Sequence, residues 1–397
     1  MKTMYQIMLC LSSGILLVAS LVNTAQADTL LTEKRVFTLP EYTTVGGETI
    51  TDVRVGWETY GELNEARDNA ILITHFFSGN SHAAGKYQES DAQPGYWDSI
   101  IGPGKAIDTN KYFVISSDTL VNANPNDPNV ITTGPASINP ATSKPYGLDF
   151  PVVTIGDFVH VQHALVSSLG IEKLHAVVGA SMGSLQAIEW AATYPDMVER
   201  MVSVIGAGAM DAWTIMSLEQ WAQPIKNDPN WNNGDYYEGE APLDGVTHTL
   251  ALITQQAMHP MIINQLAPKQ ETLPAKALES VTNNLPAVDW LFNASRARAS
   301  VADANHLLYL VRANQLFVAG HEETLKEGLA KITAKTLFMP AANDLLLKPY
   351  LAKAAVAELK ELGKEPQYEE ISGPWGHLDG VYTIQSKAET LREFIEN

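Results

Sequence analysis

The sequence predicts an α/β protein in which a mostly parallel sheet is covered by helices on both faces. Short apolar runs rich in β-branched residues recur along the 397-residue chain, and segments with helical periodicity fall between them. Strands that alternate with helices in this way are typical of parallel sheets. A hydrophobic content of 45% is ample for the core that such a sheet requires.

The apolar runs are the expected strands, and they cover residues 52–61, 69–77, 111–118, 174–181, 201–208, 335–341 and 368–373. The clearest helical segments between them cover residues 157–170, 184–195 and 350–363. Asp157 is a suitable N-cap for the first of these helices, and Gly170 is a typical residue to end it.

Two regions interrupt the alternation of strands and helices. Residues 122–150 are rich in Pro, Asn, Thr and Gly and are expected to form a long loop. Residues 210–332 have Met, Trp, Leu and Gln at helical spacings and few strand signals. The predicted organisation is therefore a core of residues 28–209 and 333–397, with residues 210–332 inserted as a mainly helical lid over a site.

The N-terminus has the pattern of a cleavable secretory signal peptide. Lys2 gives a basic start, a mostly apolar run covers residues 7–22, and the sequence AQA at 25–27 offers small residues where a signal peptidase reads them. Residues 1–27 are therefore expected to be removed, and the mature protein is expected in the periplasm or outside the cell. The alternative is an uncleaved membrane anchor, for which the apolar run is short.

Charge and cysteine content restrict the expected partners. The full chain carries a net charge of −19, and loss of the one lysine in residues 1–27 makes the mature chain one unit more negative. Such an acidic surface argues against binding to nucleic acid or to anionic membranes. Cys10 is the only cysteine and leaves with the signal peptide, so no disulfide is expected.

A nucleophile elbow is predicted at residues 179–183. The sequence Gly-Ala-Ser-Met-Gly follows an expected strand and precedes an expected helix. A sharp strand-to-helix turn crowds the backbone two residues on either side of its tip, so glycine is needed at Gly179 and Gly183. The turn lifts Ser181 above the sheet as the candidate nucleophile. The alternative is an ordinary tight turn between a strand and a helix.

The partners of the serine are expected later in the chain. A serine hydroxyl is a poor nucleophile until a base takes its proton, and on this arrangement an acid and then a histidine follow the serine. Asp344 comes just after the strand at 335–341, and His377 lies in a loop after the strand at 368–373. Taken singly, Asp344 could be a turn former and His377 a loop histidine. Asp379 is a rival acid, but it lies awkwardly close to His377.

Backbone donors for a developing oxyanion are predicted on two segments. One is the Met182 N–H at the start of the helix, and the other is an N–H in the loop after residue 74, assigned to Phe77. Phe76 and Phe77 either wall an acyl pocket or belong to the core.

No metal site and no cofactor are predicted. His160 and His163 share a helix face, but no further ligand cluster accompanies them, and no glycine-rich phosphate loop is present in the sequence.

With these motifs the chain resembles the homoserine O-acetyltransferase family of the α/β-hydrolase fold. The resemblance runs from about residue 50 to the C-terminus, and its most specific stretches are HFFSGNSHAAG at 75–85, YWDSIIGPGKAIDTNKYFVISSD at 96–118, DPNWNNGDYY at 228–237 and GH at 376–377, together with residues 150–202. It implies a Ser181–His377–Asp344 triad, an acyl-enzyme intermediate and a helical lid over a tunnel to the serine. It also makes a homodimer a reasonable expectation.

The chain departs from the family pattern at three positions. The arginine that the family carries six residues before Asp228 is replaced by Ala222, and the aspartate after the catalytic histidine is replaced by Leu378. Ser184 stands where a glycine is usual after the elbow. The resemblance therefore implies that the chemistry is retained while the charged anchors for an amino-acid acceptor are lost.

The leading hypothesis is an exported serine hydrolase that cleaves a small ester or related acyl bond. An exported enzyme does not meet acetyl-CoA, which is cytoplasmic, whereas water is always present. The alternative is an O-acyltransferase that uses homoserine or another alcohol as acceptor. A third hypothesis, from another class, is a catalytically silent binding protein on the same scaffold.

Overall fold

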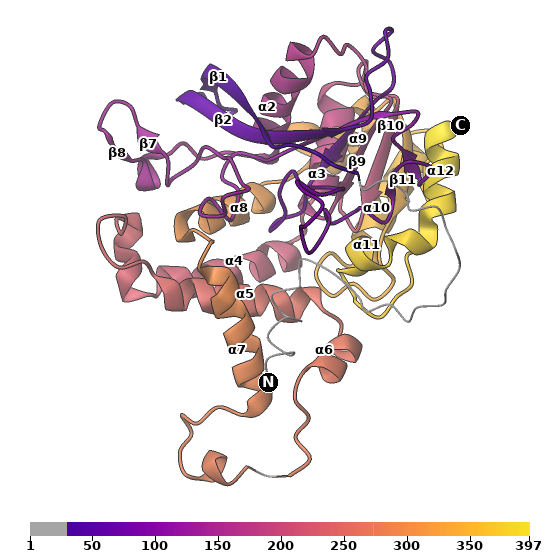
Figure 1. Ribbon diagram of the computed structural model, residues 1–397. Coiled ribbons are helices and arrows are strands. Elements are labelled where there is room, and N and C mark those ends of the chain that lie inside the picture. The colour runs from indigo at the N-terminus through magenta and orange to yellow at the C-terminus, as the bar shows by residue number, and fades with distance from the viewer. Residues whose placement is uncertain (1–29, 273) are drawn as a thin grey trace.

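The structure is a computed structural model that describes residues 30–272 and 274–397, and its centre is a large, mostly parallel sheet (Figure 1). The strand order is β1-β2-β6-β3-β9-β10-β11-β12, in which neighbours from β6 to β12 pair in parallel and β1 and β2 extend one edge antiparallel. The predicted fold class is confirmed. The predicted signal peptide, residues 1–27, lies outside the described residues.

The strands of this sheet are β1 (Arg35–Thr43), β2 (Thr49–Tyr60), β3 (Ala70–Thr74), β6 (Phe113–Ser117), β9 (Ala176–Ala180), β10 (Arg200–Val204), β11 (Lys335–Met339) and β12 (Gln367–Tyr368). Two small pairs lie outside it, and they are β4 (Ile101–Gly102) with β5 (Ile107–Asp108) and β7 (Ile138–Asn139) with β8 (Lys144–Pro145).

Within the central sheet, β1 is the strand that the sequence did not predict. Its pairing with β2 passes from Leu39 opposite Val53 to Glu41 opposite Thr51 and skips Pro40. Because proline cannot donate to the ladder, it is confined to edge strands, and β1 is such an edge. The proline and the exposed side chains of β1 conceal it from a search for buried apolar runs.

The helices are α2 (Ile155–Ser168), α3 (Met182–Thr193), α4 (Ala212–Lys226), α5 (Leu243–Ala257), α6 (Pro260–Leu266), α7 (Pro286–Ala299), α8 (Ala304–Gln315), α9 (Leu325–Lys331), α10 (Pro349–Glu361), α11 (Asp379–Tyr382) and α12 (Ala388–Glu396). Short 3₁₀ turns are η1 (Gly147–Asp149), η2 (Pro229–Gly234), η3 (Ala275–Leu278), η4 (Ala319–His321) and η5 (Ile384–Lys387).

Helices cover both faces of the sheet because successive strand residues point to opposite sides. Leu72 of β3 belongs to a core that also contains Leu185 of α3. The next residue, Ile73, belongs to a second core with Phe394 of α12. The C-terminal helix α12 therefore seals the face opposite α3 (Figure 1).

The first residue of α2 corrects one expectation. The N-cap is Thr154, whose side chain accepts a hydrogen bond from the Asp157 N–H, while the Asp157 carboxylate accepts one from the Thr154 N–H, which completes a capping box. Asp157 therefore lies three residues inside the helix, where its charge still favours the N-terminal dipole. The sequence pattern Thr-x-x-Asp at 154–157 is the capping-box signal that identifies Thr154 as the N-cap.

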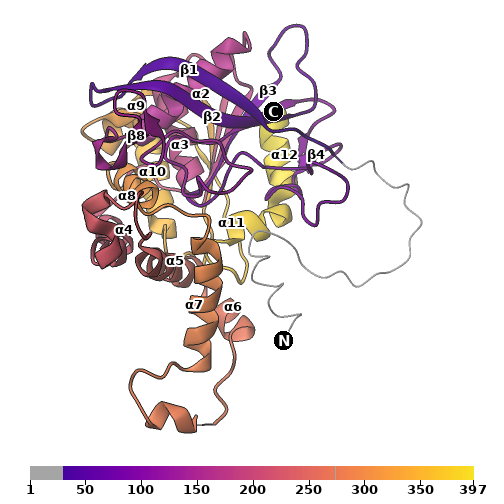
Figure 2. The same cartoon turned by 60° about the vertical axis from the view of Figure 1, so that its left-hand side comes forward.

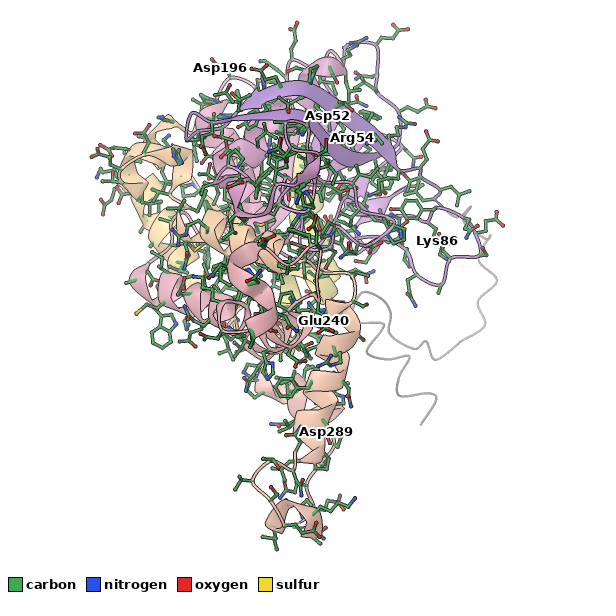
Figure 3. The ribbon with its side chains drawn as sticks, turned by 90° about the vertical axis from the view of Figure 1, so that its left-hand side faces the viewer. Asp52, Arg54, Lys86, Asp196, Glu240 and Asp289 are labelled. Carbon is green, nitrogen blue, oxygen red and sulfur yellow. The ribbon has the colours of Figure 1, made fainter. Side chains whose placement is uncertain are left out.

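Helices α4 to α9 all fall between β10 and β11, inside the segment predicted as an insertion. Helix α5 packs against both α4 and α7, and the described residues between α6 and α7, 267–272 and 274–285, project away from the rest of the molecule (Figures 1 and 2). Asp289, near the start of α7, lies next to this projecting segment (Figure 3). No helix among the described residues is long and apolar enough to cross a membrane.

Candidate active site

Ser181 occupies the tip of a sharp turn between β9, which ends at Ala180, and α3, which begins at Met182. Its backbone has φ 57° and ψ −121°, a conformation that costs free energy for any residue with a Cβ atom. Surrounding structure must hold the serine there.

The two elbow glycines allow this close packing. A Cβ atom at Gly179 would lie 2.1 Å from the Gly183 carbonyl oxygen and 2.2 Å from Thr74 Oγ1. A Cβ atom at Gly183 would lie 2.0 Å from the Thr74 carbonyl oxygen. Thr74 also donates from Oγ1 to the Gly183 carbonyl at 2.7 Å, so the end of β3 is fastened to the elbow. No side chain fits at either glycine without moving backbone.

Ser181, His377 and Asp344 lie in one hydrogen-bonded line. The distance from Ser181 Oγ to His377 Nε2 is 2.8 Å, and the distance from His377 Nδ1 to Asp344 Oδ2 is 2.7 Å. With Nδ1 protonated, the histidine donates to the carboxylate and leaves Nε2 free to accept the serine proton. The three side chains come from positions 181, 344 and 377, far apart in the chain.

All three groups are almost enclosed. Ser181 is 7% exposed, Asp344 4% and His377 5%. Exclusion of water strengthens electrostatic interactions within such a group. The second oxygen of Asp344, Oδ1, accepts from the N–H groups of Leu346 and Leu347 at 2.8 and 3.0 Å, which fixes the orientation of the carboxylate.

Asp379, the rival acid, has other partners. Its carboxylate accepts from the Trp375 and Gly376 N–H groups and from Thr383 Oγ1. Burial raises its pKa, and the charge of Asp344 adds to that rise. Asp379 therefore ties down both ends of the loop that carries His377.

Two backbone N–H groups face no protein acceptor near the elbow. Among the hydrogen bonds of the described residues, neither the Phe77 N–H nor the Met182 N–H has a partner. Met182 opens α3, where unpaired N–H groups and the helix dipole favour negative charge. The Phe77 ring lies 5.4 Å from the Trp221 ring of α4 and belongs to the core, while Phe76 packs edge-on against Tyr96.

A chain of buried amides links the segments that carry these donors. Trp190 Nε1 donates to Gln162 Oε1 at 2.8 Å, and Gln162 Nε2 donates to Gln186 Oε1 at 2.6 Å. Gln186 Nε2 then donates to the His75 carbonyl oxygen at 3.2 Å. Helix α3 and the loop that begins at His75 are thereby held together. The signal that could have revealed this network is the pair of glutamines in otherwise apolar helical faces.

A buried charged cluster anchors the next part of the same loop. The Glu58 carboxylate contacts Lys34 Nζ and His82 Nδ1, each at 2.9 Å, and accepts from the Tyr87 hydroxyl at 2.8 Å. Burial alone would raise the pKa of Glu58, but the hydrogen bond with His82 and the charge of Lys34 outweigh it and lower the pKa to about 2. The cluster joins β2 to the loop at 82–87.

The three residues that depart from the family pattern, Ala222, Leu378 and Ser184, differ in burial and in their contacts. Ala222 is buried in the core on α4, and Leu378 is half-buried directly after His377. Ser184 is buried, and its hydroxyl donates to the Ser181 carbonyl at 2.7 Å, so it supports the elbow.

The histidines considered for a metal have aromatic partners. His163 stacks on Tyr194 with ring centres 4.1 Å apart, and His160 lies 3.2 Å from the Tyr42 hydroxyl. Across residues 30–272 and 274–397, no group of three or more His, Cys, Asp or Glu side chains is arranged to hold a metal ion.

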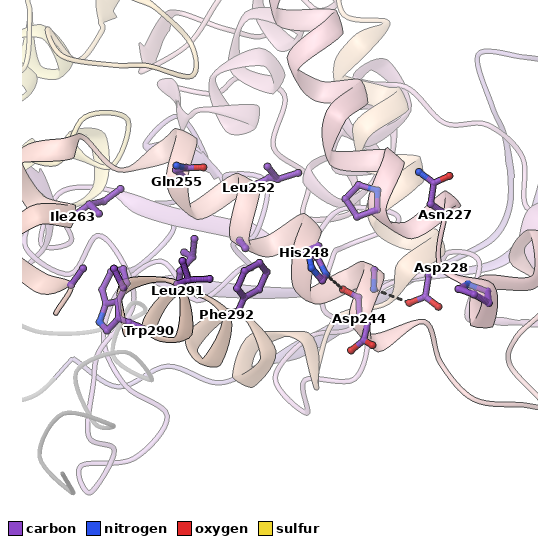
Figure 4. Close-up of a pocket in the computed structure, with 17 residues that line it drawn as sticks. Asn227, Asp228, Asp244, His248, Leu252, Gln255, Ile263, Trp290, Leu291 and Phe292 are labelled. Carbon is purple, nitrogen blue, oxygen red and sulfur yellow. Dashed lines mark hydrogen bonds between the residues drawn. The ribbon is translucent and has the colours of Figure 1, made fainter. Parts of the chain in front are cut away.

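A sizeable pocket lies away from the triad, among the helices between β10 and β11. It has a volume of about 710 Å³ and is lined by residues of α4, α5, α6 and α7, including Leu252, Ile263 and Phe292 (Figure 4). Ser181, Asp344 and His377 are not among its lining residues.

Comparisons with known proteins agree with this architecture. The model of the α/β-hydrolase fold family matches residues 106–381, so the chain is a member of that fold family. Homoserine O-acetyltransferase from Symbiobacterium thermophilum is 37% identical over 383 residues, which cover 94% of this chain and 98% of that protein. The chain belongs to the homoserine O-acetyltransferase family.

Two solved structures are similar to the chain over most of its length. Esterase E22 is 56% identical, with a TM-score of 0.90 and coverage of 92% of this chain and 100% of that chain. Homoserine O-acetyltransferase from Bacillus anthracis is 38% identical, with a TM-score of 0.89 and coverage of 92% and 98%. The protein is therefore an enzyme of the hydrolase or acyltransferase type.

Proposed function

We propose that this protein is an exported serine hydrolase that cleaves small esters through an acyl-enzyme on Ser181. The observation that carries the proposal is the pair of hydrogen bonds, 2.8 and 2.7 Å long, that joins Ser181 to His377 and His377 to Asp344. The first length is typical of a nucleophile that gives its proton to a general base, and the second is typical of an acid that orients that base.

In the first half-reaction, Ser181 Oγ attacks the ester carbonyl carbon while its proton passes to His377 Nε2. Asp344 stabilises the resulting imidazolium, and the N–H groups of Phe77 and Met182 hold the oxyanion. The tetrahedral intermediate then collapses, the bond to the alcohol oxygen breaks, and His377 returns the proton to that oxygen. The alcohol leaves and the acyl group stays on Ser181.

In the second half-reaction, water takes the place of the alcohol. His377 accepts a proton from the water as its oxygen attacks the acyl carbon, and the same N–H groups hold the second oxyanion. Collapse of this intermediate breaks the bond to Ser181 Oγ, which regains the proton from His377. The products are the free acid and the original enzyme.

Three observations favour water over an alcohol as the final acceptor. Esterase E22 shares 56% of its residues with the chain, against 38% for the Bacillus anthracis acetyltransferase. Ala222 and Leu378 are uncharged where the family pattern has charged side chains. The signal-peptide pattern at residues 1–27 would also separate the enzyme from cytoplasmic acetyl-CoA.

The second candidate is an O-acyltransferase, and the 37% identity to a homoserine O-acetyltransferase over nearly the whole of both chains favours it. The acyl-enzyme step is the same in both candidates. They differ only in whether water or an alcohol attacks the acyl group.

Direct comparison of donors and acceptors distinguishes these candidates. The purified protein is assayed with 4-nitrophenyl acetate, with and without homoserine, and with acetyl-CoA plus homoserine. We expect ester hydrolysis that does not depend on homoserine. Formation of O-acetylhomoserine from acetyl-CoA, with negligible ester hydrolysis, would reverse the assignment.

Labelling by a fluorophosphonate tests the proposal against a catalytically silent binding protein. We expect wild-type protein to be labelled and Ser181→Ala to resist labelling. Export is tested separately by fractionating the producing cells and sequencing the N-terminus of the protein. The expected sequence begins at Asp28 in the periplasm or medium, and a cytoplasmic protein that retains residues 1–27 would contradict export.

A further inference from the structure

Arg298 extends from the end of α7 that lies next to α5. Its Nη1 donates to Thr254 Oγ1 of α5 at 2.9 Å, and its side chain is partly exposed. The opposite end of α7, at Pro286, follows the projecting segment (Figures 1 and 2). Arg298 therefore lies at the end of α7 that packs on α5.

The part of α5 that Arg298 contacts leads directly to the loop of His377. Met258, the residue after α5, forms a β-bridge with Gly376, and the His259 N–H donates to the Trp375 carbonyl at 3.1 Å. Thr254 precedes Met258 by one helical turn, about 6 Å of rise. The guanidinium therefore lies within about one turn of the segment that positions the general base.

Arg298 has no ionic partner in the described part of the chain. No carboxylate there lies within 4.0 Å of it, although Arg296 on the same helix pairs with Asp244. Burial lowers the pKa of the Arg298 guanidinium, and the nearby phenol of Tyr382 opposes that effect. Tyr382 belongs to α11, which follows the His377 loop.

A partly buried cation without a carboxylate partner is unfavourable, because the protein removes part of its hydration and returns one hydrogen bond to a neutral hydroxyl. The C-terminal dipole of α7 offsets some of this cost but supplies no full negative charge. The planar guanidinium keeps donors free for a bidentate contact, the geometry that a carboxylate matches. A bound anion would satisfy both the charge and the unused donors.

We propose that Arg298 binds a carboxylate of the substrate, so that the preferred substrates are short esters that carry one carboxylate several bonds from the scissile carbonyl. This inference rests on the proposed ester hydrolysis by Ser181 and names the substrate class for that site. The carboxylate belongs either to the acyl part or to the alcohol part, and the experiment distinguishes the two.

The test compares esters that differ only in charge. One pair is 4-nitrophenyl hydrogen glutarate and the corresponding neutral glutaramate, which carry the difference in the acyl part. The other pair is the acetate esters of 4-hydroxybutanoate and 4-hydroxybutanamide, which carry it in the alcohol. For wild-type enzyme we expect kcat/KM to favour the anionic member of one pair about tenfold or more, since hydrogen bonds to charged groups are the stronger ones.

Two arginines of α7 supply the variant and its control. Arg298→Gln is expected to reduce the anionic-to-neutral ratio at least about tenfold, mainly through a higher KM for the anionic ester. Arg296→Gln removes an exposed arginine two residues away and is expected to keep the wild-type ratio. Titration with a neutral fluorophosphonate counts active sites, so each kcat/KM refers to folded enzyme.

The outcomes separate the inference from the proposed function. A wild-type ratio near one in both pairs, or a ratio that survives Arg298→Gln, would overturn the role of Arg298 and leave ester hydrolysis standing. If no ester of either pair is cleaved, both proposals fall. If Arg298→Gln does not fold, the wild-type ratios still decide, and Arg298→Lys, which keeps the charge without the planar fork, is expected to give an intermediate ratio.

Discussion

Replacement of Asp344 by asparagine has a predictable effect because the structure fixes how the new amide must face. Oδ1 of Asp344 accepts from the N–H groups of Leu346 and Leu347 at 2.8 and 3.0 Å, while Oδ2 contacts His377 Nδ1 at 2.7 Å. An asparagine keeps the two backbone bonds only with its carbonyl oxygen at the Oδ1 position. Its NH₂ group must then point at His377.

An NH₂ group donates and cannot accept, so it forces the wrong tautomer on the histidine. Nδ1 of His377 must become the acceptor, which leaves the proton on Nε2, the atom that should receive the Ser181 proton. The general base is thereby lost. We expect kcat/KM for a 4-nitrophenyl ester to fall about 10⁴-fold, equivalent to about 5 kcal/mol of transition-state stabilisation.

The assay is the initial rate of hydrolysis per folded molecule, together with the thermal midpoint of unfolding. Asp379→Asn is the matched control, because Asp379 is equally buried and holds the same loop without contacting His377. The control is expected to lower the midpoint but to keep kcat/KM within about tenfold of wild type. Equal losses in the two variants, or an Asp344→Asn enzyme that retains a tenth of wild-type activity, would refute the tautomer argument.

Three further predictions concern the structure around the serine. Gly183→Ala places a Cβ atom 2.0 Å from backbone of β3, so we expect a loss of about 3 kcal/mol in the free energy of unfolding and of most ester hydrolysis; an unchanged calorimetric midpoint would contradict it. The pKa of Glu58 is lowered from 4.5 to about 2, so its ionised form stabilises the fold above pH 4.5, and about 3 kcal/mol of that stability is lost as the pH falls towards 2. Urea unfolding between these pH values should be less pH-dependent in Glu58→Gln than in wild type, and parallel curves would exclude this role. Gln186→Leu removes the donor to the His75 carbonyl and should lower kcat about tenfold with KM nearly unchanged, whereas a change in KM alone would point to altered substrate binding instead.

The elements that position Ser181 could be predicted because their signals are local. The glycines at 179 and 183 are demanded by contacts of the turn itself, and the buried strands β3, β9 and β11 are continuous apolar runs. Asp344 and His377 were found because the ends of parallel strands meet at one edge of the sheet. The hydrogen bonds that join His377 to Ser181 and to Asp344 could be expected from the order of the residues, but their geometry comes only from the structure.

Interactions that depend on distant partners were not predictable. Lys34 directly precedes β1 and Glu58 lies on β2, 24 positions later, and neither residue stands out in the sequence until β1 and β2 pair. Gln162 and Gln186 carry a weak signal as polar residues on buried helical faces, but their partnership requires the packing of α2 on α3. That Arg298 has a hydrogen bond with Thr254 but no carboxylate partner among the described residues is likewise a property of the packing of α7 on α5, because no sequence pattern reveals a missing partner.

The central claim is that the Ser181 hydroxyl becomes acylated during turnover. Rapid mixing with 4-nitrophenyl acetate, acid quench and peptide mapping by mass spectrometry tests it most directly. The account predicts one acetyl group on the peptide that contains Ser181 in wild-type protein, and none in Ser181→Ala or, at the same mixing time, in His377→Ala. Turnover with no acetyl group on that peptide, or an acetyl group on another residue that persists in Ser181→Ala, would contradict it.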